Sequence, residues 1–545
     1  MGTMHTDLVG DITKHLKRII SETNGITLND TLELSAHSDF VQGNKNISKL
    51  INEFRRLLSN YQEEEIDIYT LLNHPVSDAL FCFFKDFPLP YQEAHTHLTG
   101  SLTADFVFPH LKKLLEGPHK EIYEKKITDI YGQEALPINT VDDVDKLIRL
   151  KEGEYFDKYL KILTLPKLIL TSKQIHSDAA YHMAKEIYTK YNVGMLRLKF
   201  TLNRESTSSE DQIPGLEDIT GEDVVLGLYD GFMRFKKEFP KFHFILAPSF
   251  RKEADFFDGK NFERKEDHFM SQVDYILDLI DKYPFLADHL NEVDTVGSER
   301  DLYRKRHFKQ MQYGFRKLQY KGFKLRSHHG ETWYSLRKGV QAVDNAMNIW
   351  HIDTLEHGLS LGINPNYFFH SMYQRVMRKN RRGEAIKEGS SDYLELMDMD
   401  WYKYQEVRDK LVSGIPLEPE EEIHFVKTKF HMAREVEHYQ HDVLNRMITK
   451  GVALTALPSS NNKLTRAFDD YKDHPFSWWE KKGVNLSVGT DNYVTLNTNF
   501  IREMLILLYS DPDNLKITKL LMVTTGETHR PLISQLLWKM RKIKS

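Results

Sequence analysis

From about residue 88 onward, short apolar runs alternate with longer segments of helical periodicity. The longer segments place apolar residues three and four positions apart, as amphipathic helices do, whereas the short runs have the length and the flanking turns of strands. Alternating strands and helices favour a parallel sheet, and eight such strands favour an α/β fold of the (β/α)8 TIM-barrel type. The predicted strands cover residues 91–97, 195–200, 242–249, 290–296, 323–329, 354–357, 452–458 and 484–490.

Two other parts of the chain exceed what a minimal barrel needs. Residues 1–87 carry helical patterns such as ISKLINEFRRLLSNYQ, so we predict a helical N-terminal region before a barrel over 88–545. Residues 102–175 add helix after the first strand, and residues 366–435 form a long, charge-rich helical insertion. Such an insertion serves as a lid, a partner surface or an oligomer contact. The N-terminal helices and the insertion are therefore candidate surfaces for an oligomer or a protein partner.

Composition excludes several classes of protein. Lys and Arg total 74 against 79 Asp and Glu, a formal charge of −5, which does not suggest binding to nucleic acid or to a membrane surface. The single cysteine, Cys82, rules out a disulfide within the chain and a four-cysteine zinc site. No signal segment or membrane-spanning apolar run is visible, so we expect a cytoplasmic location.

The first strand of the barrel ends in EAHTHLTGS, with His95 and His97 one residue apart. Residues i and i+2 of a strand point to the same face, so the two imidazoles lie together. They can share a metal ion or pack in a core, and the pair alone does not distinguish these two roles.

Further polar residues follow the other strands of the predicted barrel. In this fold, active groups gather at the carboxyl ends of the strands. The residues at these ends are His95 and His97 on the first strand, His328 and Glu331 at the fifth, His357 at the sixth, and Asp491 at the eighth. Each is unremarkable alone, but their arrival at four strand ends favours a metal site over isolated structural residues.

These motifs resemble those of a known family. The set H-x-H-x-x-G-S, H-x-G-E, H-G and T-D-N, in this order, is similar to the adenosine/AMP deaminase family of the metal-dependent amidohydrolase superfamily. The similarity runs from about residue 91 to 510 and leaves out the N-terminal region and the insertion. The segment D-x-x-G-x-E at 294–299 and the turn P-S-S-N at 458–461 also match.

The resemblance implies one zinc ion per subunit. Its ligands would be His95, His97, His328 and Asp491, because zinc takes neutral imidazoles and carboxylates and a catalytic site keeps a position for water. Zinc lowers the pKa of such a water from about 15.7 to about 7, which makes hydroxide available at neutral pH. Asp491 would also orient this nucleophile.

The resemblance also assigns the proton-transfer groups and the backbone contacts. His357 would act as the base for the water or stabilise the resulting hydroxide, which adds to C6 of a purine. Glu331 would protonate N1 of the purine, after which ammonia leaves and a 6-oxopurine remains. Gly297 would offer its N–H to N3, and Gly330 lets the backbone pass close to the ligand. His329 points away and receives no catalytic role.

Two departures from the family bear on the substrate. Asn492 stands where many members carry a second Asp that donates to purine N7, and its amide donates at any pH. Thr99 stands where adenosine-specific members carry an Asp that accepts from the ribose 5′-hydroxyl. An anion there would repel a 5′-phosphate by about 1–4 kcal/mol at 4 Å, so Thr99, followed by Gly100 and Ser101, makes phosphate binding possible.

Four cations are candidates for contact with a phosphate: Arg197, Lys199, Arg251 and Lys252. Arg197 and Lys199 replace the family's E-x-R on the second strand, and Arg251 and Lys252 follow the third. The alternative role for each is an ion pair with a carboxylate of the barrel. Together with Thr99 they favour AMP or dAMP over adenosine as the substrate.

Other functions remain open at this point. The same barrel and metal could act on N6-modified AMP or on ATP. A non-catalytic sensor or scaffold could bind a nucleotide and assemble partners through the helical additions. The presence of both His357 and Glu331 argues against a scaffold, because each is a proton-transfer group that binding alone does not need.

Overall fold

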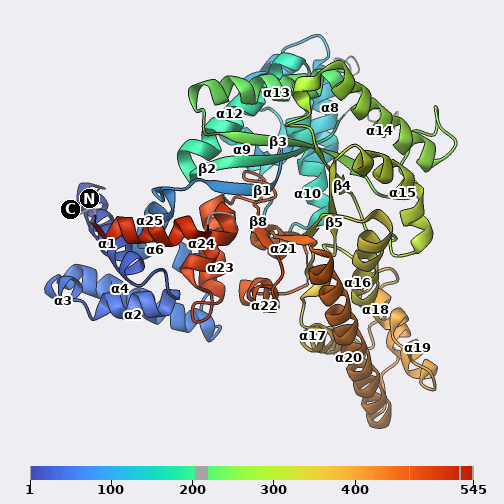
Figure 1. Cartoon of the computed structure of the whole chain (residues 1–545). Helices are drawn as coiled ribbons and strands as arrows, with labels where there is room; N and C mark the ends of the chain where they lie inside the picture. The colour runs from blue at the N-terminus through green and yellow to red at the C-terminus, as the bar shows by residue number, and fades with distance from the viewer. Residues whose placement is uncertain (1, 203–218, 466, 527–529, 543–545) are drawn as a thin grey trace.

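A closed ring of eight parallel strands forms the centre of the molecule (Figure 1). The computed structural model describes residues 2–202, 219–465, 467–526 and 530–542. The strands pair in chain order, and a bridge between Thr96 and Asp491 brings the first and last strands together. The predicted (β/α)8 barrel is therefore confirmed. The strands are β1 (Tyr91–His97), β2 (Val193–Phe200), β3 (His243–Arg251), β4 (Glu292–Val296), β5 (Lys324–His329), β6 (Thr354–His357), β7 (Ala453–Ala456) and β8 (Leu486–Val488).

The observed strands coincide with the predicted ones except at their ends. The strand predicted over 452–458 ends at Ala456, because Pro458 begins helix α21 (Pro458–Leu464). Proline suits the first turn of a helix, where its missing N–H has no partner to lose.

Helices cover the outside of the barrel between consecutive strands. Two of them, α12 and α13, pack closely because Gly227 and Gly231 on α13 have no side chain. A Cβ at Gly231 would lie 2.1 Å from the carbonyl oxygen of Ser177 on α12. Within the described part of the chain, no helix is long and apolar enough to cross a membrane. The covering helices are α12 (Lys173–Tyr191), α13 (Gly221–Glu238), α14 (Lys265–Lys282), α15 (Lys305–Tyr320), α16 (Leu336–Asn345), α22 (Phe476–Lys482) and α23 (Phe500–Ser510).

The N-terminal region is helical, as predicted, and it shares the hydrophobic core of the barrel. Phe54 packs edge-on against Tyr509 of α23, with ring centroids 5.6 Å apart. Gln62 donates to the carbonyl oxygen of Tyr509 at 2.8 Å, and the Tyr61 hydroxyl donates to Asp470 at 2.6 Å. Helix α1 also packs against α25 (Arg530–Lys542) near the other end of the chain (Figure 1). The helices of the region are α1 (Gly2–Glu22), α2 (Leu28–Ala36), α3 (Asp39–Gly43), α4 (Lys45–Gln62), α5 (Ile68–Leu72) and α6 (Pro75–Lys85).

Helices also fill the two segments that exceed the minimal barrel. The insertion after β6 projects from the barrel (Figure 1), and its longest helix, α20, starts at Pro419 and stops before Gly451, whose φ is +70°. The insertion is tied to α16 by Glu395, which accepts the Leu336 N–H at 2.8 Å. The helices after β1 are α7 (Ala104–Leu115), α8 (Lys120–Tyr131), α9 (Val141–Ile148), α10 (Phe156–Ile162) and α11 (Thr164–Leu168). Those of the insertion are α17 (Pro365–Asn380), α18 (Ser391–Asp398), α19 (Gln405–Ser413) and α20 (Pro419–Lys450).

The shared core makes the N-terminal helices part of the stability of the barrel. Replacing fully buried Phe54 by Ala should lower the free energy of unfolding by about 3–5 kcal/mol, as expected when a buried ring leaves a cavity. Urea unfolding, monitored with a spectroscopic signal from the barrel, measures this free energy. The matched control is Leu34→Ala in the same region, where 46% exposure predicts a change within about 0.5 kcal/mol. Equal effects of the two variants would show that α4 does not support the barrel.

Candidate metal centre and active site

Four histidines and one aspartate meet at the carboxyl ends of the strands. His95 and His97 come from β1, His328 from β5, His357 from the end of β6, and Asp491 follows β8. The Nε2 atoms of His95 and His97 are 3.2 Å apart, and those of His97 and His328 are 3.3 Å apart. The structure thus brings the predicted ligands together from three strand ends.

The other nitrogens of these rings explain why the cluster suits a cation. His328 Nδ1 lies 3.1 Å from Asp294 Oδ1, and His95 Nδ1 lies 2.9 Å from Glu356 Oε2, although bent from a straight hydrogen bond. A carboxylate accepts, so the Nδ1 atoms carry the hydrogens and the Nε2 lone pairs face inward. Lone pairs on nitrogens about 3 Å apart repel unless a positive ion lies among them. The donor set therefore fits a metal such as zinc.

Burial favours the neutral form, which metal ligation requires, for three of the imidazoles. Loss of solvent lowers the pKa of His97 to about 3 and that of His357 to about 4, and it holds the pKa of His328 well below its usual value. His95 differs: burial and Lys199 lower its pKa, but the carboxylates of Glu356 and Asp491 outweigh them and raise it.

Asp491 supplies the negative charge of the cluster. Its Oδ1 lies 3.5 Å from His97 Nε2 and 3.7 Å from His95 Nε2, and the Ser460 hydroxyl donates to its Oδ2 at 2.5 Å. Burial alone would raise the pKa of Asp491, but the imidazoles of His95, His97 and His357 beside it outweigh burial and hold the pKa below its usual range. Three imidazoles and one ionised carboxylate form a ligand set that zinc accepts.

His357 and Asp491 both have left-handed backbone conformations, with φ of +68° and +63°. Such a conformation costs a residue other than glycine about 1–3 kcal/mol and occurs preferentially at functional sites. The Nε2 atom of His357 is buried, has no hydrogen-bond partner among the described residues, and lies 3.8 Å from Glu331 Oε2. This nitrogen is therefore free to interact with a bound molecule.

Glu331 sits on a loop that Glu299 holds from below. Glu299 accepts the backbone N–H groups of Gly330, Glu331 and Thr332 at 2.7–2.8 Å. Gly330 has φ of +72°, which glycine tolerates without strain. Burial raises the pKa of Glu331 well above its usual value, and the charges of Asp491 and Glu299 raise it further. The raised pKa favours the protonated form of Glu331.

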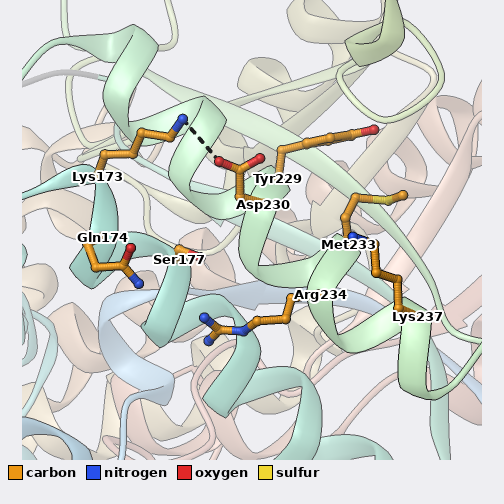
Figure 2. A pocket seen from close by; sticks show the side chains of 8 residues that line it. All are labelled: Lys173, Gln174, Ser177, Tyr229, Asp230, Met233, Arg234 and Lys237. Carbon is orange, nitrogen blue, oxygen red and sulfur yellow. Dashed lines mark ion pairs between the residues drawn. The ribbon is translucent and has the colours of Figure 1, made fainter.

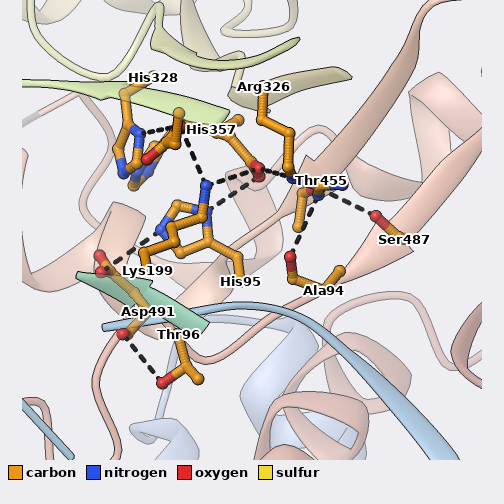
Figure 3. A network of polar contacts seen from close by, with 12 residues as sticks. Ala94, His95, Thr96, Lys199, Arg326, His328, His357, Thr455, Ser487 and Asp491 are labelled. Carbon is orange, nitrogen blue, oxygen red and sulfur yellow. Dashed lines mark hydrogen bonds and ion pairs between the residues drawn. The ribbon is translucent and has the colours of Figure 1, made fainter. Parts of the chain in front are cut away.

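A chain of buried charges contacts the imidazoles of the candidate metal ligands (Figure 3). Lys199 Nζ is 2.9 Å from Glu356 Oε1 and 3.1 Å from Asp294 Oδ1, so it touches both carboxylates that pair with metal-ligand imidazoles. Arg326 approaches Glu356 at 2.5 Å and also donates to Thr455 at 3.1 Å. Thr455 thus has a structural role as an acceptor for Arg326.

The four candidate phosphate-binding cations lie in different places. Lys199 is fully buried in the chain of charges, and Arg197 pairs with Glu292 at 3.2 Å, so both take the alternative role in ion pairs. Lys252 is buried and donates to the carbonyl oxygen of His328. Arg251 pairs with Glu253 at 2.6 Å at the end of β3, and its side chain is 40% exposed. Among the four, only Arg251 presents a partly open guanidinium.

The turn after β1 is a short 3-10 helix, Thr99–Ser101. The Ser101 hydroxyl shares a hydrogen bond with Thr96 at 3.0 Å, and a Cβ at Gly100 would lie 1.6 Å from Asn492 Oδ1. Ser101 and Gly100 are thus engaged in holding the turn against the end of β8. Thr99 is half-buried, and its contact with a ligand stays a prediction.

Tyr159 on α10 is a site residue that no sequence motif indicated. Its hydroxyl lies 3.4 Å from Asp491 Oδ1 and accepts a hydrogen bond from Asn492 Nδ2 at 2.5 Å. Asn492 Nδ2 also donates to Asp491 Oδ1 at 2.6 Å, while Asn492 Oδ1 is buried without a partner. The amide donors that we predicted to read purine N7 are therefore directed at protein groups in this state.

Gly297 follows β4 with φ of +104°. This conformation strains any residue with a side chain, and a Cβ there would also displace the carboxylate of Glu253, which lies 2.2 Å away. Its contact with purine N3 stays a prediction.

A groove between α12 and α13 lies outside this site (Figure 2). It has a volume of about 770 Å3. Its cations are partly neutralised, because Lys173 pairs with Asp230 at 3.0 Å and Arg234 pairs with Asp178 at 2.9 Å. None of the residues of the metal centre lines it. The lining residues are Lys173, Gln174, Ser177, Tyr229, Asp230, Met233, Arg234 and Lys237.

The contact between Asp294 and His328 should affect the metal directly. We expect Asp294→Ala to weaken zinc binding about 10- to 100-fold, because the imidazole loses the partner that fixes its orientation. Competition against a chromophoric chelator measures the affinity. Asp274→Ala, which removes an exposed carboxylate paired with Lys317, serves as the control and should leave the affinity unchanged. Unchanged affinity in Asp294→Ala would exclude this role.

No protein-family model matches the chain, and no curated protein matches its sequence. Solved structures resemble it distantly. An adenine deaminase from Arthrobacter aurescens has 13% identity and a TM-score of 0.46, over 83% of this chain and 99% of that one. The N6-methyl-AMP deaminase from Arabidopsis thaliana has 13% identity and a TM-score of 0.46, over 84% of this chain and 97% of that one. An ADAL protein in complex with IMP has 12% identity and a TM-score of 0.47, over 84% of this chain and 98% of that one. At TM-scores below 0.5 these structures say nothing about the substrate of this chain, and the resemblance to the adenosine/AMP deaminase family rests on the sequence motifs.

Proposed function

We propose that this protein is a zinc-dependent hydrolase that removes the 6-amino group of a purine nucleotide or nucleoside as ammonia. The observation that carries the proposal is the position of Glu331, a carboxyl group whose raised pKa favours its protonated form, 3.8 Å from His357 beside the candidate ligand set. An acid opposite a water-activating centre is what hydrolysis of an aromatic amidine needs, because the ring resists addition until N1 is protonated.

The residues His95, His97, His328 and Asp491 would hold the zinc ion, which when bound lowers the pKa of a water molecule to about 7. Glu331 donates its proton to N1 of the purine as the oxygen nucleophile adds to C6. The carboxylate so formed then takes the hydroxyl proton of the adduct and passes it to the amino group, which leaves as ammonia. Solvent returns a proton to Glu331. His357 accepts a proton from the water or donates to the hydroxide through Nε2.

We propose a 5′-monophosphate, AMP or dAMP, as the substrate rather than adenosine. Thr99 removes the negative charge that adenosine-specific members place near the 5′-position, and Arg251 keeps a partly exposed guanidinium at the end of β3. Lys199 and Arg197 no longer support this choice, because barrel carboxylates engage them.

A substrate panel on zinc-loaded protein tests the proposal. Ammonia release is measured with AMP, dAMP, adenosine and ATP, and methylamine release with N6-methyl-AMP. We expect AMP or dAMP to give the highest kcat/KM. A preference for ATP or N6-methyl-AMP would revise the substrate, and no release from any of the five would argue against purine deamination.

The Glu331→Gln variant tests the acid. We expect kcat to fall about 10²-fold or more while zinc content stays the same, because glutamine keeps the shape but cannot give up a proton. Ammonia release and elemental analysis provide the two readings. The control is Glu116→Gln, an exposed change at the end of α7 that should leave both unchanged. A full rate in Glu331→Gln would exclude Glu331 as the acid.

The Thr99→Asp variant tests whether a 5′-phosphate of the substrate lies near residue 99. A carboxylate at this position should reduce kcat/KM for AMP more than for adenosine, by about 5-fold or more, through repulsion of about 1–4 kcal/mol. Thr99→Asn adds similar bulk without charge and is the control. An equal loss for the two substrates would place the phosphate elsewhere.

A further inference from the structure

Asn461, in the middle of α21, lies between two buried imidazoles. One end of its side-chain amide is 2.9 Å from Nδ1 of His357, and the other end is 3.1 Å from Nε2 of His474. All three side chains are at most 7% exposed. We call these three side chains, His357, Asn461 and His474, the row. Buried polar groups pair donor with acceptor, so the position of each hydrogen in the row is determined by its neighbours.

The row starts at a group that can only donate. The backbone N–H of Phe476, the first residue of α22, points at Nδ1 of His474 at 3.2 Å. His474 Nδ1 must therefore be without hydrogen. Burial lowers the pKa of His474 to about 3, so the ring is neutral and its one hydrogen is on Nε2.

A hydrogen on His474 Nε2 requires an acceptor on Asn461. In the structure the oxygen of Asn461 faces His357 and its NH2 group faces His474. With that orientation the neutral ring of His474 would have to accept at both nitrogens, which it cannot do. A half-turn of the amide exchanges oxygen and nitrogen and removes the conflict. The oxygen of Asn461 then faces His474, and its NH2 group faces Nδ1 of His357.

We infer that His474, acting through Asn461, is a positioning residue that holds the hydrogen of neutral His357 on Nε2, directed into the active site. That nitrogen is buried and has no partner among the described residues. The tautomer itself is independent of the proposed function, but its role rests on that function. During deamination His357 then donates a hydrogen bond to the oxygen nucleophile. It does not act as the base that accepts a proton from the water.

The chain contains a matched control for this geometry. His74 also precedes a proline at the start of a helix, α6, and its Nδ1 accepts the N–H of Val76 at 3.2 Å. His74 is as buried as His474, at 7% exposure. Its Nε2, however, has no hydrogen-bond partner within the part of the chain that the structure describes. A variant of His74 therefore loses the same kind of hydrogen bond, from a backbone N–H at a helix start to Nδ1, without disturbing Asn461.

Neutron diffraction from zinc-loaded crystals exchanged into D2O tests the tautomer without any assay of activity. We expect deuterium on Nε2 of both His474 and His357, and none on their Nδ1 atoms. Deuterium on Nδ1 of His357 would overturn the inference, whether or not the protein is a deaminase.

Kinetics test the role of the row. His474→Leu removes the donor, and Asn461→Asp can only accept and so forces the hydrogen onto Nδ1 of His357. Each should lower kcat for AMP by about 10²- to 10⁴-fold, with KM and zinc content unchanged. His474→Gln keeps an N–H donor and should restore most of kcat, and His74→Leu should leave kcat unchanged. Full activity of Asn461→Asp, or equal losses in His474→Leu and His74→Leu, would overturn the role. If every variant and the parent protein fail to release ammonia while the deuterium positions are as expected, the proposed function fails and the tautomer stands.

Discussion

Two carboxylates, Glu356 and Asp294, each interact with a cation and with an imidazole at the same time. On one side, Lys199 lies 2.9 Å from Glu356 and 3.1 Å from Asp294; on the other, His95 and His328 lie at the same two distances. A fully buried carboxylate stays ionised only beside a positive partner. While ionised, it binds the Nδ1 hydrogen of its imidazole and leaves Nε2 free for a metal. The geometry of the candidate metal centre therefore depends on the ammonium group of Lys199, together with the Arg326 guanidinium that contacts Glu356 at 2.5 Å.

This arrangement gives the interior of the barrel an unusual composition. Most barrel interiors of this type are filled by branched apolar residues in layers. Here the layer beneath the site holds ion pairs, which contribute little net stability because desolvation offsets most of their attraction. Their effect lies in orientation. Arg326 and Glu292 extend the same network toward the opposite end of the strands, so the ligand rings rest on a rigid, charge-balanced base.

The strands and the meeting of the candidate ligands were predictable for the same physical reason. Local periodicity marks each strand, and the barrel topology alone brings strand ends together, so His95 and Asp491 meet although 396 positions separate them. Tyr159 was not predictable, because its place depends on how the helices between β1 and β2 fold back over the site. The sequence left two roles open for Lys199, contact with a phosphate or an ion pair inside the barrel. The residues next to it in the sequence do not distinguish these roles. The choice came from carboxylates on β4 and β6, far away in the chain.

The packing of α1–α6 against α23 and α25 has a consequence for synthesis of the chain. Gln62 and Tyr509, which are joined by a hydrogen bond, are 447 residues apart. At about 5–20 residues per second, roughly 20–90 s pass between their translation. During that interval the helices of the N-terminal region can pack on one another, as α1 does on α6 and α2 does on α4, but the surface of α23 and α25 that covers their remaining apolar faces does not yet exist. The nascent chain must therefore keep these helices from aggregating, either through transient partners or by associating with themselves, until the last barrel helices arrive.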